Sequence, residues 1–252
     1  MEGLILHIPH ASRHIPPEDR ALLLPDEARL QRELLCMTDA LTDLLLADIP
    51  AKVPRIVCPV SRLVVDVERF SDDAEEPMAA RGMGAVYARL STGEPLRSED
   101  LGHREVLMRR WYHPHHAALQ AAVDDALALH GHCLIIDMHS FNSAPLPHEP
   151  DQAPVRPELC IGFDAFHSPI NEVDARSLCA ELGFKGAVNR PFAGSIVPAA
   201  HWQRTAAVKS LMIEVRRDLY MSEASGEQLP GFSAMAARIA ALVRRLHEFS
   251  GR

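Results

Sequence analysis

The chain has 252 residues, of which 47% are apolar and 24% are charged, and its formal net charge is −8 at pH 7. This composition is typical of a globular α/β protein with a substantial core and excludes a disordered or fibrous chain. Since it has neither a basic stripe nor a long acidic run, we expect neither a nucleic-acid surface nor an anionic-membrane surface. Fourteen histidines are the unusual feature, because histidine serves both as metal ligand and as acid–base catalyst.

The five cysteines are widely spaced, contain no Cys-x-x-Cys pair and mostly lie in apolar segments. They predict buried free thiols in a reducing compartment. The first residues lack a basic leader, and no later segment is long enough to span a bilayer. We therefore expect a cytoplasmic protein with one domain over residues 1–252, and its oligomeric state stays open.

The spacing of apolar residues predicts strands that alternate with helices. Short apolar runs that end in turn residues indicate strands, and apolar residues three and four apart indicate helices. In chain order we expect strand 3–8, helix 25–48, strands 55–60 and 63–67, helix 98–130, strands 133–140 and 159–164, helix 170–182, strands 187–195 and 210–217, and helix 229–249. This alternation favours a three-layer α/β/α architecture.

Three further segments have their own expectations. Residues 71–95 are acidic and punctuated by Gly and Pro, which predicts an excursion over the surface. The long helix contains Pro114, which must kink or interrupt it, and we expect its histidines at 113, 115 and 116 on an exposed face. The Pro-rich segment 142–158 has the composition of an active-site loop or a flexible connector.

Polar residues follow or end the predicted strands. His10 comes directly after the first strand and His139 near the end of the strand at 133–140, where open α/β sheets carry their chemistry. Two histidines and one carboxylate leave an open coordination position on zinc, as in hydrolytic zinc sites. From the residues alone, the carboxylate would come from Asp39, Asp66 or Asp137.

Glu214 is isolated among apolar residues of the last predicted strand. Partial desolvation there would raise the pKa of its carboxyl group toward neutrality. Such a glutamate suits a general base that accepts a proton from the attacking water and passes it to the leaving amine. The alternative is a structural carboxylate paired with Arg216 or Arg217.

A second polar cluster lies between residues 62 and 69, where Arg62, Asp66, Glu68 and Arg69 interrupt an apolar segment. One interpretation is a set of surface ion pairs that contributes little to stability. The other is an anion-binding wall, because the planar guanidinium group of arginine matches a carboxylate.

In five segments the sequence resembles the N-formylglutamate amidohydrolase family. They occur in the family's order and are 8–16, which contains Ile-Pro-His-Ala-Ser, 59–69, 136–140, 189–194 and 212–221. The resemblance implies a three-layer α/β/α fold with a mixed central sheet, like that of zinc-dependent exopeptidases. It also implies hydrolysis of an N-acyl amino acid, with N-formyl-L-glutamate in histidine breakdown as the type substrate.

The resemblance also implies roles for individual residues. One zinc ion would be held by His10, Asp39 and His139, because a looser likeness to zinc muramoyl-alanine amidases favours Asp39 over Asp66, and Glu214 would be catalytic. Asp137 shares a strand face with His139, so we expect it, with Ser140, to orient the ligands from outside the coordination shell. The substrate-binding candidates are Arg62, Asp66, Arg69, Asn189, Arg190, His201 and Arg216.

Two other functions remain open. One is a catalytically silent protein that binds small acidic metabolites through the arginines alone. The other is a zinc amidase or carboxypeptidase that acts on peptides or cell-wall fragments, for which we expect a wider cleft and, for cell-wall work, an export signal. The two histidines and Glu214 argue against the silent protein.

Overall fold

The computed structural model of the protein describes residues 1–98 and 101–250, and in these ranges the strands form one six-stranded sheet. The strand order is β2-β1-β3-β6-β4-β5. The strands are β1 Leu4–Ile8, β2 Arg55–Val57, β3 Cys133–Phe141, β4 Leu159–Gly162, β5 Gly186–Val188 and β6 Val208–Arg216. Strands β2, β1, β3 and β6 are parallel, whereas β4 pairs with β6 in the antiparallel sense. The predicted mixed sheet is therefore confirmed.

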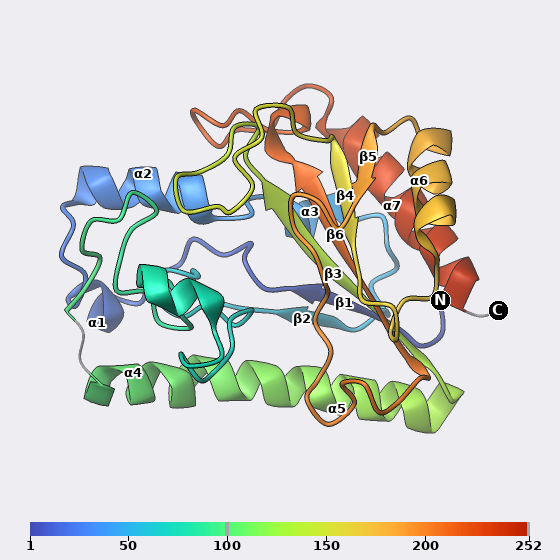
Figure 1. Ribbon diagram of the computed structural model, residues 1–252, viewed down its shortest axis with the longest axis horizontal. Coiled ribbons are helices and arrows are strands. Elements are labelled where there is room, and N and C mark those ends of the chain that lie inside the picture. Colours follow the sequence, from blue (N-terminus) through green and yellow to red (C-terminus); the bar gives the residue numbers. More distant parts are fainter. Residues whose placement is uncertain (99–100, 251–252) are drawn as a thin grey trace.

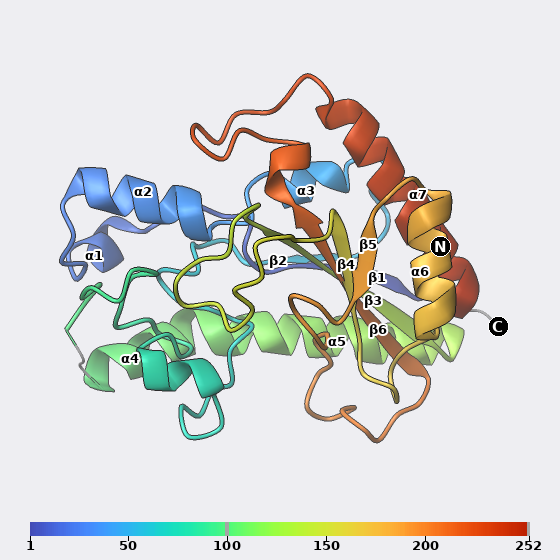
Figure 2. The same cartoon turned by 45° about the horizontal axis from the view of Figure 1, so that its top comes forward.

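Helices cover both faces of this sheet, with α5 along one face and α3, α6 and α7 on the other (Figures 1 and 2). None of the helices in the described ranges combines the length and the apolar character that crossing a bilayer requires. The helices are α1 Pro17–Arg20, α2 Glu27–Met37, α3 Thr42–Leu45, α4 Leu101–Leu107, α5 His113–His130, α6 Glu172–Glu181 and α7 Phe232–Ser250, with 3-10 turns at Pro77–Arg81 and Arg217–Leu219.

Strand β3 is buried along its whole length, because each of its faces packs against a helix layer. Ile136 and Met138 belong to the core shared with α7, whereas Ile135 packs against Leu119 and Val123 of α5. Burial on both faces is the reason for the almost uninterrupted apolar run of this strand. By the same alternation, Asp137 and His139 of this strand lie on the α5 side of the sheet.

The predicted helix 25–48 is instead two helices, α2 and α3, separated by a turn. Thr38 is extended, with ψ 135°, and Leu41 adopts a left-handed φ of 66°, so the helical hydrogen bonds cannot continue. Asp39 lies in this turn and its N–H donates to the carbonyl of His10 at 3.0 Å. The break therefore holds Asp39 beside the loop that follows β1.

The predicted strand 63–67 is wrong, because this segment folds into successive turns. The N–H of Val64 bonds back to the carbonyl of Ser61, and the N–H of Asp66 bonds to the carbonyl of Ala85. These bonds to carbonyl groups of turns and loops take the place of a strand ladder. The apolar side chains of the segment are still buried, which is why their pattern resembled that of a core strand.

The segment 71–95 is not a surface excursion over its whole length. Met83 and Tyr87 are fully buried and pack in a second apolar cluster with Leu34 of α2. The buried end of Tyr87 is polar, and its hydroxyl donates to the carboxylate of Asp66. The segment thus forms one wall behind the polar residues of the neighbouring turns.

The predicted helix 98–130, of which residues 99 and 100 lie outside the described ranges, consists of α4, a π-helical turn at Met108–Tyr112 and α5. Pro114 has no N–H with which to bond the carbonyl four residues earlier. The hydrogen-bond ladder widens directly before it, and the three pieces continue as one rod (Figure 1). His115 is not on an exposed face as predicted, since only 6% of its surface is accessible.

Candidate active site

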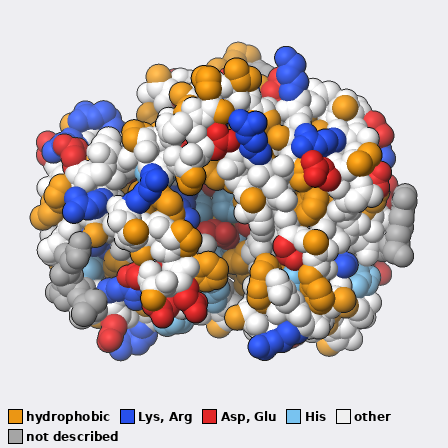
Figure 3. Space-filling view, viewed as in Figure 1, with side chains coloured by type: hydrophobic (Ala, Val, Ile, Leu, Met, Phe, Trp, Pro, Cys, Tyr) orange, Lys and Arg blue, Asp and Glu red, His pale blue; other side chains and the backbone are white. Residues whose placement is uncertain are grey.

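The polar residues at the strand ends line one cavity with a volume of about 250 Å³. His139 of β3 and Glu214 of β6 are direct neighbours in the parallel ladder and lie on the same face of the sheet. His10 follows β1, which pairs with β3 on its other side. Histidine rings and carboxylates are visible at the bottom of the hollow in Figure 3. The carboxyl ends of three adjacent strands thus supply the centre of the site.

His10, Asp39 and His139 bring three possible metal ligands together, with donor atoms within 4.8 Å of one another. The Oδ2 atom of Asp39 lies 3.1 Å from Nδ1 of His139 and 3.5 Å from Nδ1 of His10. All three side chains are buried. Two imidazole nitrogens and one carboxylate oxygen are a donor set that suits zinc and leaves a position open.

The other ring nitrogens of these histidines are oriented by carboxylates. Nε2 of His10 lies 2.8 Å from Oδ1 of Asp66, and Nε2 of His139 lies 2.9 Å from Oδ1 of Asp137. Metal-binding histidines usually donate their second N–H in this way, which fixes the tautomer. Among the described residues, Nδ1 of His10 is buried without a hydrogen-bond partner. Both observations fit a metal bound through the two Nδ1 atoms.

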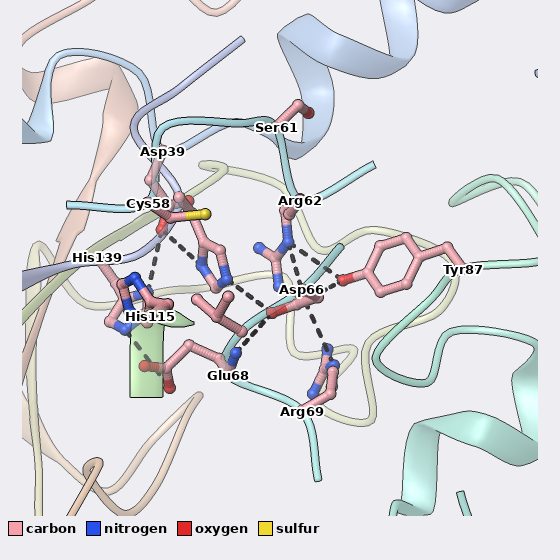
Figure 4. Close-up of polar contacts among 12 residues, drawn as sticks. Asp39, Cys58, Ser61, Arg62, Asp66, Glu68, Arg69, Tyr87, His115 and His139 are labelled. Carbon is pink, nitrogen blue, oxygen red and sulfur yellow. Dashed lines mark hydrogen bonds and ion pairs between the residues drawn. The ribbon is translucent and has the colours of Figure 1, made fainter. Parts of the chain in front are cut away.

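Asp66 contacts Nε2 of His10, whereas Asp39 lies near Nδ1 of the same ring. Figure 4 shows that Asp66 has its own partners, since Arg62, Arg69 and Tyr87 surround its carboxylate. Its carboxylate accepts hydrogen bonds from Nη2 of Arg62 at 2.7 Å and from the hydroxyl of Tyr87. Burial opposes its charge, but Arg62 and His10 hold the pKa of Asp66 well below the ordinary value. Of the three carboxylates that the residues left open, the structure places Asp39 between the two Nδ1 atoms.

Arg217 orients Asp39, a contact that the sequence reasoning missed. Its guanidinium group is buried, donates to Oδ1 of Asp39 at 2.8 Å and to Oγ of Ser140 at 3.0 Å, and leaves Oδ2 of Asp39 for the histidines. Arg216 instead pairs with Asp218 outside the cavity. The strand ends at Arg216 and the 3-10 turn follows, so strand alternation gave no signal for Arg217.

Glu214 is 6% exposed, and its Oε2 atom is buried without a hydrogen-bond partner in the described part of the chain. Burial raises the pKa of its carboxyl group to about 8, although the neighbouring His139 lowers it, and the charge of Asp39 raises it further. A carboxyl group with a pKa near neutrality can both accept and return a proton at physiological pH. Arg216 pairs with Asp218 and Arg217 pairs with Asp39, so the geometry does not favour the alternative of a structural ion pair between Glu214 and either arginine.

Carboxyl groups are more numerous than guanidinium groups around the cavity. Carboxylates outnumber guanidinium groups by two when all are ionised: Asp39, Asp66, Glu68, Asp137 and Glu214 face Arg62, Arg69 and Arg217. Burial, with the charge of Asp137 next in effect, raises the pKa of Glu68 well above its ordinary value. In the protein without metal, protons on Glu68, Glu214 and His139 offset the excess of carboxyl groups, and a divalent cation bound here would take their place.

A second group of possible ligands, His7, Glu68 and Asp137, lies beside the first. Here both ring nitrogens of His7 already have protein partners, since Nδ1 lies 2.8 Å from Oδ1 of Asp137 and Nε2 lies 2.7 Å from Nε2 of His115. A fully hydrogen-bonded imidazole has no lone pair to offer a metal. The first group is therefore the better candidate for a metal site.

The predicted substrate-binding arginines divide into two sets. Arg62 and Arg69 line the cavity. Nε of Arg69 is buried and has no hydrogen-bond partner among the described residues. Arg190 is exposed and pairs with Asp151, so its guanidinium group lies outside the cavity lining, as does that of Arg216.

Asn189 and His201 are also placed away from the cavity lining. The side-chain oxygen of Asn189 accepts the N–H of Phe163 at 2.9 Å, which stabilises its left-handed φ of 51°. His201 contacts Asp124 of α5 at 2.8 Å. Both side chains have structural partners where the sequence suggested donors to the substrate.

The segment 142–158 lines the cavity, which agrees with the prediction of an active-site loop and not with that of a flexible connector. It supplies the side chains Asn142, Leu146, His148 and Glu149. The carboxylate of Glu149 pairs with Arg156 of the same segment at 2.6 Å. An apolar wall that sequence reasoning missed completes the cavity with Cys36, Met37, Phe141, Phe192 and Met212.

The protein thus belongs to the class of α/β proteins in which a polar pocket lies at the carboxyl ends of the parallel strands. Residues 3–221 match the model of the N-formylglutamate amidohydrolase family, and the chain belongs to this family. The resemblance of the sequence to this family is thereby confirmed.

Solved structures show the same fold. The crystal structure of N-formylglutamate amidohydrolase from Ralstonia eutropha JMP134 is 22% identical and superimposes with a TM-score of 0.85, covering 100% of this chain and 95% of that one. A gene product of Agrobacterium tumefaciens is 18% identical, with a TM-score of 0.68 and coverage of 100% and 92%. A search of the curated proteins gives no match.

Proposed function

We propose that the protein hydrolyses the amide bond of an N-acyl amino acid, N-formyl-L-glutamate or a close relative, with one divalent metal ion, zinc. Its family and the name of the Ralstonia eutropha relative support the reaction. One observation supports the metal in particular. Oδ2 of Asp39 lies between the Nδ1 atoms of His10 and His139, and the Nε2 atoms of the same two rings contact carboxylates.

His10, Asp39 and His139 would hold the metal. Bound there, the metal would polarise the scissile carbonyl and lower the pKa of the attacking water. Burial opposes a charge on His139, but Asp137 and Asp39 hold its pKa well above the ordinary value, so that metal binding must displace a proton from this ring. Asp66 and Asp137 keep the two rings in the tautomer that presents Nδ1.

Glu214 would move the proton. Its carboxylate takes a proton from the water that attacks the acyl carbon, and the same group returns this proton to the amide nitrogen as the carbon–nitrogen bond breaks. The products are a carboxylate, formate for a formyl group, and the free amino acid. The pKa of about 8 allows both half-steps near neutral pH.

Arg62 and Arg69 are the proposed clamps for the carboxylates of the substrate. Both line the cavity, and Arg62 donates two hydrogen bonds to Asp66. Arg69 makes longer ion pairs, 3.6 Å from Nε to Asp66 and 3.8 Å from Nη1 to Glu76, and its Nε atom has no hydrogen bond in the described ranges. Arg69 therefore retains more capacity to bind a substrate anion. Asp66 would orient Arg62 and His10 through its hydrogen bonds and would not contact the substrate itself.

The size of the cavity favours a small substrate over a peptide. Its volume of about 250 Å³ is below that of pockets for drug-sized ligands, which are about 300–1,000 Å³. The raised pKa of Glu214 and the Nδ1 atom of His10, which has no hydrogen-bond partner among the described residues, favour a catalyst over a silent binding protein.

The cytoplasmic location and the single domain stay predictions. All five cysteines lie in the described ranges and are free thiols, which is consistent with a reducing compartment.

The central test is a metal-dependent assay of the purified protein. We expect about one bound zinc per chain and release of formate from N-formyl-L-glutamate that stops on chelation and returns on addition of zinc. A panel with N-formyl and N-acetyl derivatives of glutamate, aspartate and leucine identifies the acyl group and amino acid. A protein that binds no metal and releases no carboxylate with added zinc would contradict the proposal.

Replacing Arg69 by Met tests the clamp. We expect KM for N-formyl-L-glutamate to rise about 10- to 100-fold, the loss of about 1.5–3 kcal/mol from a charged hydrogen bond, with little change in kcat. The matched control is Arg190→Met, because this guanidinium group is 63% exposed and pairs with Asp151. An unchanged KM for Arg69→Met, or a rise for Arg190→Met, would assign the clamp to another arginine.

A further inference from the structure

Two buried histidines extend the hydrogen bonds of the site into the layer formed by α5. His7 of β1 is fully buried and His115 of α5 is 6% exposed. Oδ1 of Asp137 lies 2.9 Å from Nε2 of His139 and 2.8 Å from Nδ1 of His7, and Nε2 of His7 lies 2.7 Å from Nε2 of His115. The catalytic proposal uses neither His7 nor His115.

The contacts determine which atom carries each proton. An ionised carboxylate only accepts hydrogen bonds, so both His139 and His7 must donate to Asp137. Burial lowers the pKa of His7, against the effect of Asp137, and lowers that of His115 to about 2, so both rings are neutral. His7 carries its single proton on Nδ1 and accepts at Nε2. The contact of 2.7 Å between the two Nε2 atoms then requires the proton of His115 on its own Nε2.

We propose that His7 and His115 are positioning residues for the metal site: His115 donates to His7, His7 donates to Asp137, and Asp137 thereby holds the ring of His139 with Nδ1 toward Asp39. This inference rests on the proposed metal-dependent function. It adds two residues, from β1 and α5, that no motif of the sequence indicated as part of the site.

In the helix layer, His115 of α5 is the residue that contacts His7. The π-helical turn at Met108–Tyr112 directly precedes α5, and π-turns inside helices are frequent near functional sites. His116, the next residue, points elsewhere and contacts the carbonyl of Val67 at 2.9 Å. Only His115 of this pair reaches the sheet face that carries Asp137.

If His7 and His115 had only a packing role, a residue of similar size without hydrogen bonds would serve as well. Variants that preserve the size of the side chain therefore separate packing from orientation of Asp137 through hydrogen bonds. His7→Leu and His115→Leu remove the hydrogen bonds. His7→Asn keeps a donor at the position of Nδ1, and His115→Gln keeps one at the position of Nε2. His116→Leu is the matched control on the same helical turn, since it removes a hydrogen bond outside the chain of contacts.

The measurement is the zinc dissociation constant of the whole protein by chelator competition, with thermal unfolding in chelator to verify that each variant is folded. We expect the two Leu variants to bind zinc about tenfold more weakly, the lower end of the effect of residues that support metal ligands. His7→Asn and His115→Gln should recover most of this loss, and His116→Leu should bind as the wild type does. ¹⁵N shifts of the wild type should show His7 protonated at Nδ1 and His115 at Nε2.

The inference fails if the wild type binds zinc and both Leu variants, still folded, bind it as tightly. It also fails if the Leu and amide variants weaken binding equally, because packing alone would then explain the effect. A wild-type protein that shows His7 protonated on Nε2 also contradicts it, whichever variants fold. Absence of zinc binding by the wild type itself is a different outcome, which would refute the proposed function.

Discussion

Glu214→Gln should lower kcat by about 10²- to 10⁴-fold, the usual contribution of a general acid–base group, while the protein keeps about one metal ion per chain. Gln has nearly the shape of Glu but cannot take a proton from water. Glu214 lies beside the proposed ligands without belonging to the group that brings three ligand atoms together. The measurements are kcat with N-formyl-L-glutamate and metal content of the purified variant.

Stability in chelator gives this variant a second readout with a defined sign. The pKa of Glu214 rises from an ordinary 4.5 to about 8 in the folded protein without metal. Between these values the folded state keeps a proton that the unfolded state releases, so this group makes the protein less stable as the pH rises. Glu214→Gln lacks the titration, and its Tm relative to the wild type should therefore increase from pH 5 to pH 8.

Two results would contradict the role of Glu214. Loss of metal together with turnover would make Glu214 a ligand and not the acid–base group. A Tm difference between wild type and variant that is constant from pH 5 to pH 8 would show that the carboxyl group has no raised pKa in the folded protein. The two readouts are independent, since one needs metal and the other is made in chelator.

His139→Ala should abolish metal binding and turnover together. This ring is the central member of the site, because it contacts Asp39 through Nδ1 and Asp137 through Nε2. Its removal takes away one ligand and leaves the buried carboxylate of Asp137 without one of its two histidine donors. We expect the metal content to fall from about one to near zero, measured by elemental analysis of protein purified without chelator.

The matched control for His139→Ala is His201→Ala. The sequence suggested His201 as a donor to the substrate, but the structure places it against Asp124 of α5. His201→Ala should keep its metal and its kcat, so a comparable loss in both variants would point to general unfolding. A His139→Ala protein with full metal content would refute the assignment of the ligands. Removing metal from the wild type with a chelator should reproduce the loss of turnover reversibly.

Much of the site could be predicted from local patterns. A buried strand that ends in polar residues is recognisable in the sequence, and parallel strands bring their carboxyl ends to one edge of the sheet, so His10, His139 and Glu214 could be expected together. The period of two placed Asp137 on the face of His139. These inferences held because the position of each residue follows from its place along its own strand and from the parallel arrangement of β1, β3 and β6.

Loops and turns were the places where the sequence misled. Segment 63–67 has the composition of a strand, but its hydrogen bonds close on Ser61 and Ala85. The helix expected around Asp39 is broken by the conformations of Thr38 and Leu41. Apolar residues are buried in a turn as readily as in a strand, so composition alone does not separate the two.

The sequence by itself therefore determined the sheet, its alternation with helices and the strand-end residues of the site, because these follow from local periodicity. Local patterns left Asp39, Asp66 and Asp137 open, and only the resemblance to known families favoured Asp39. The tertiary structure shows Asp39 beside the Nδ1 atoms, and it alone revealed the contact of Arg217 with Asp39 and the link from Asp137 through His7 to His115. Apart from His10 and Asp39, these pairs are separated by a hundred residues or more along the chain. Their meeting depends on how loops and layers pack, which no local pattern records.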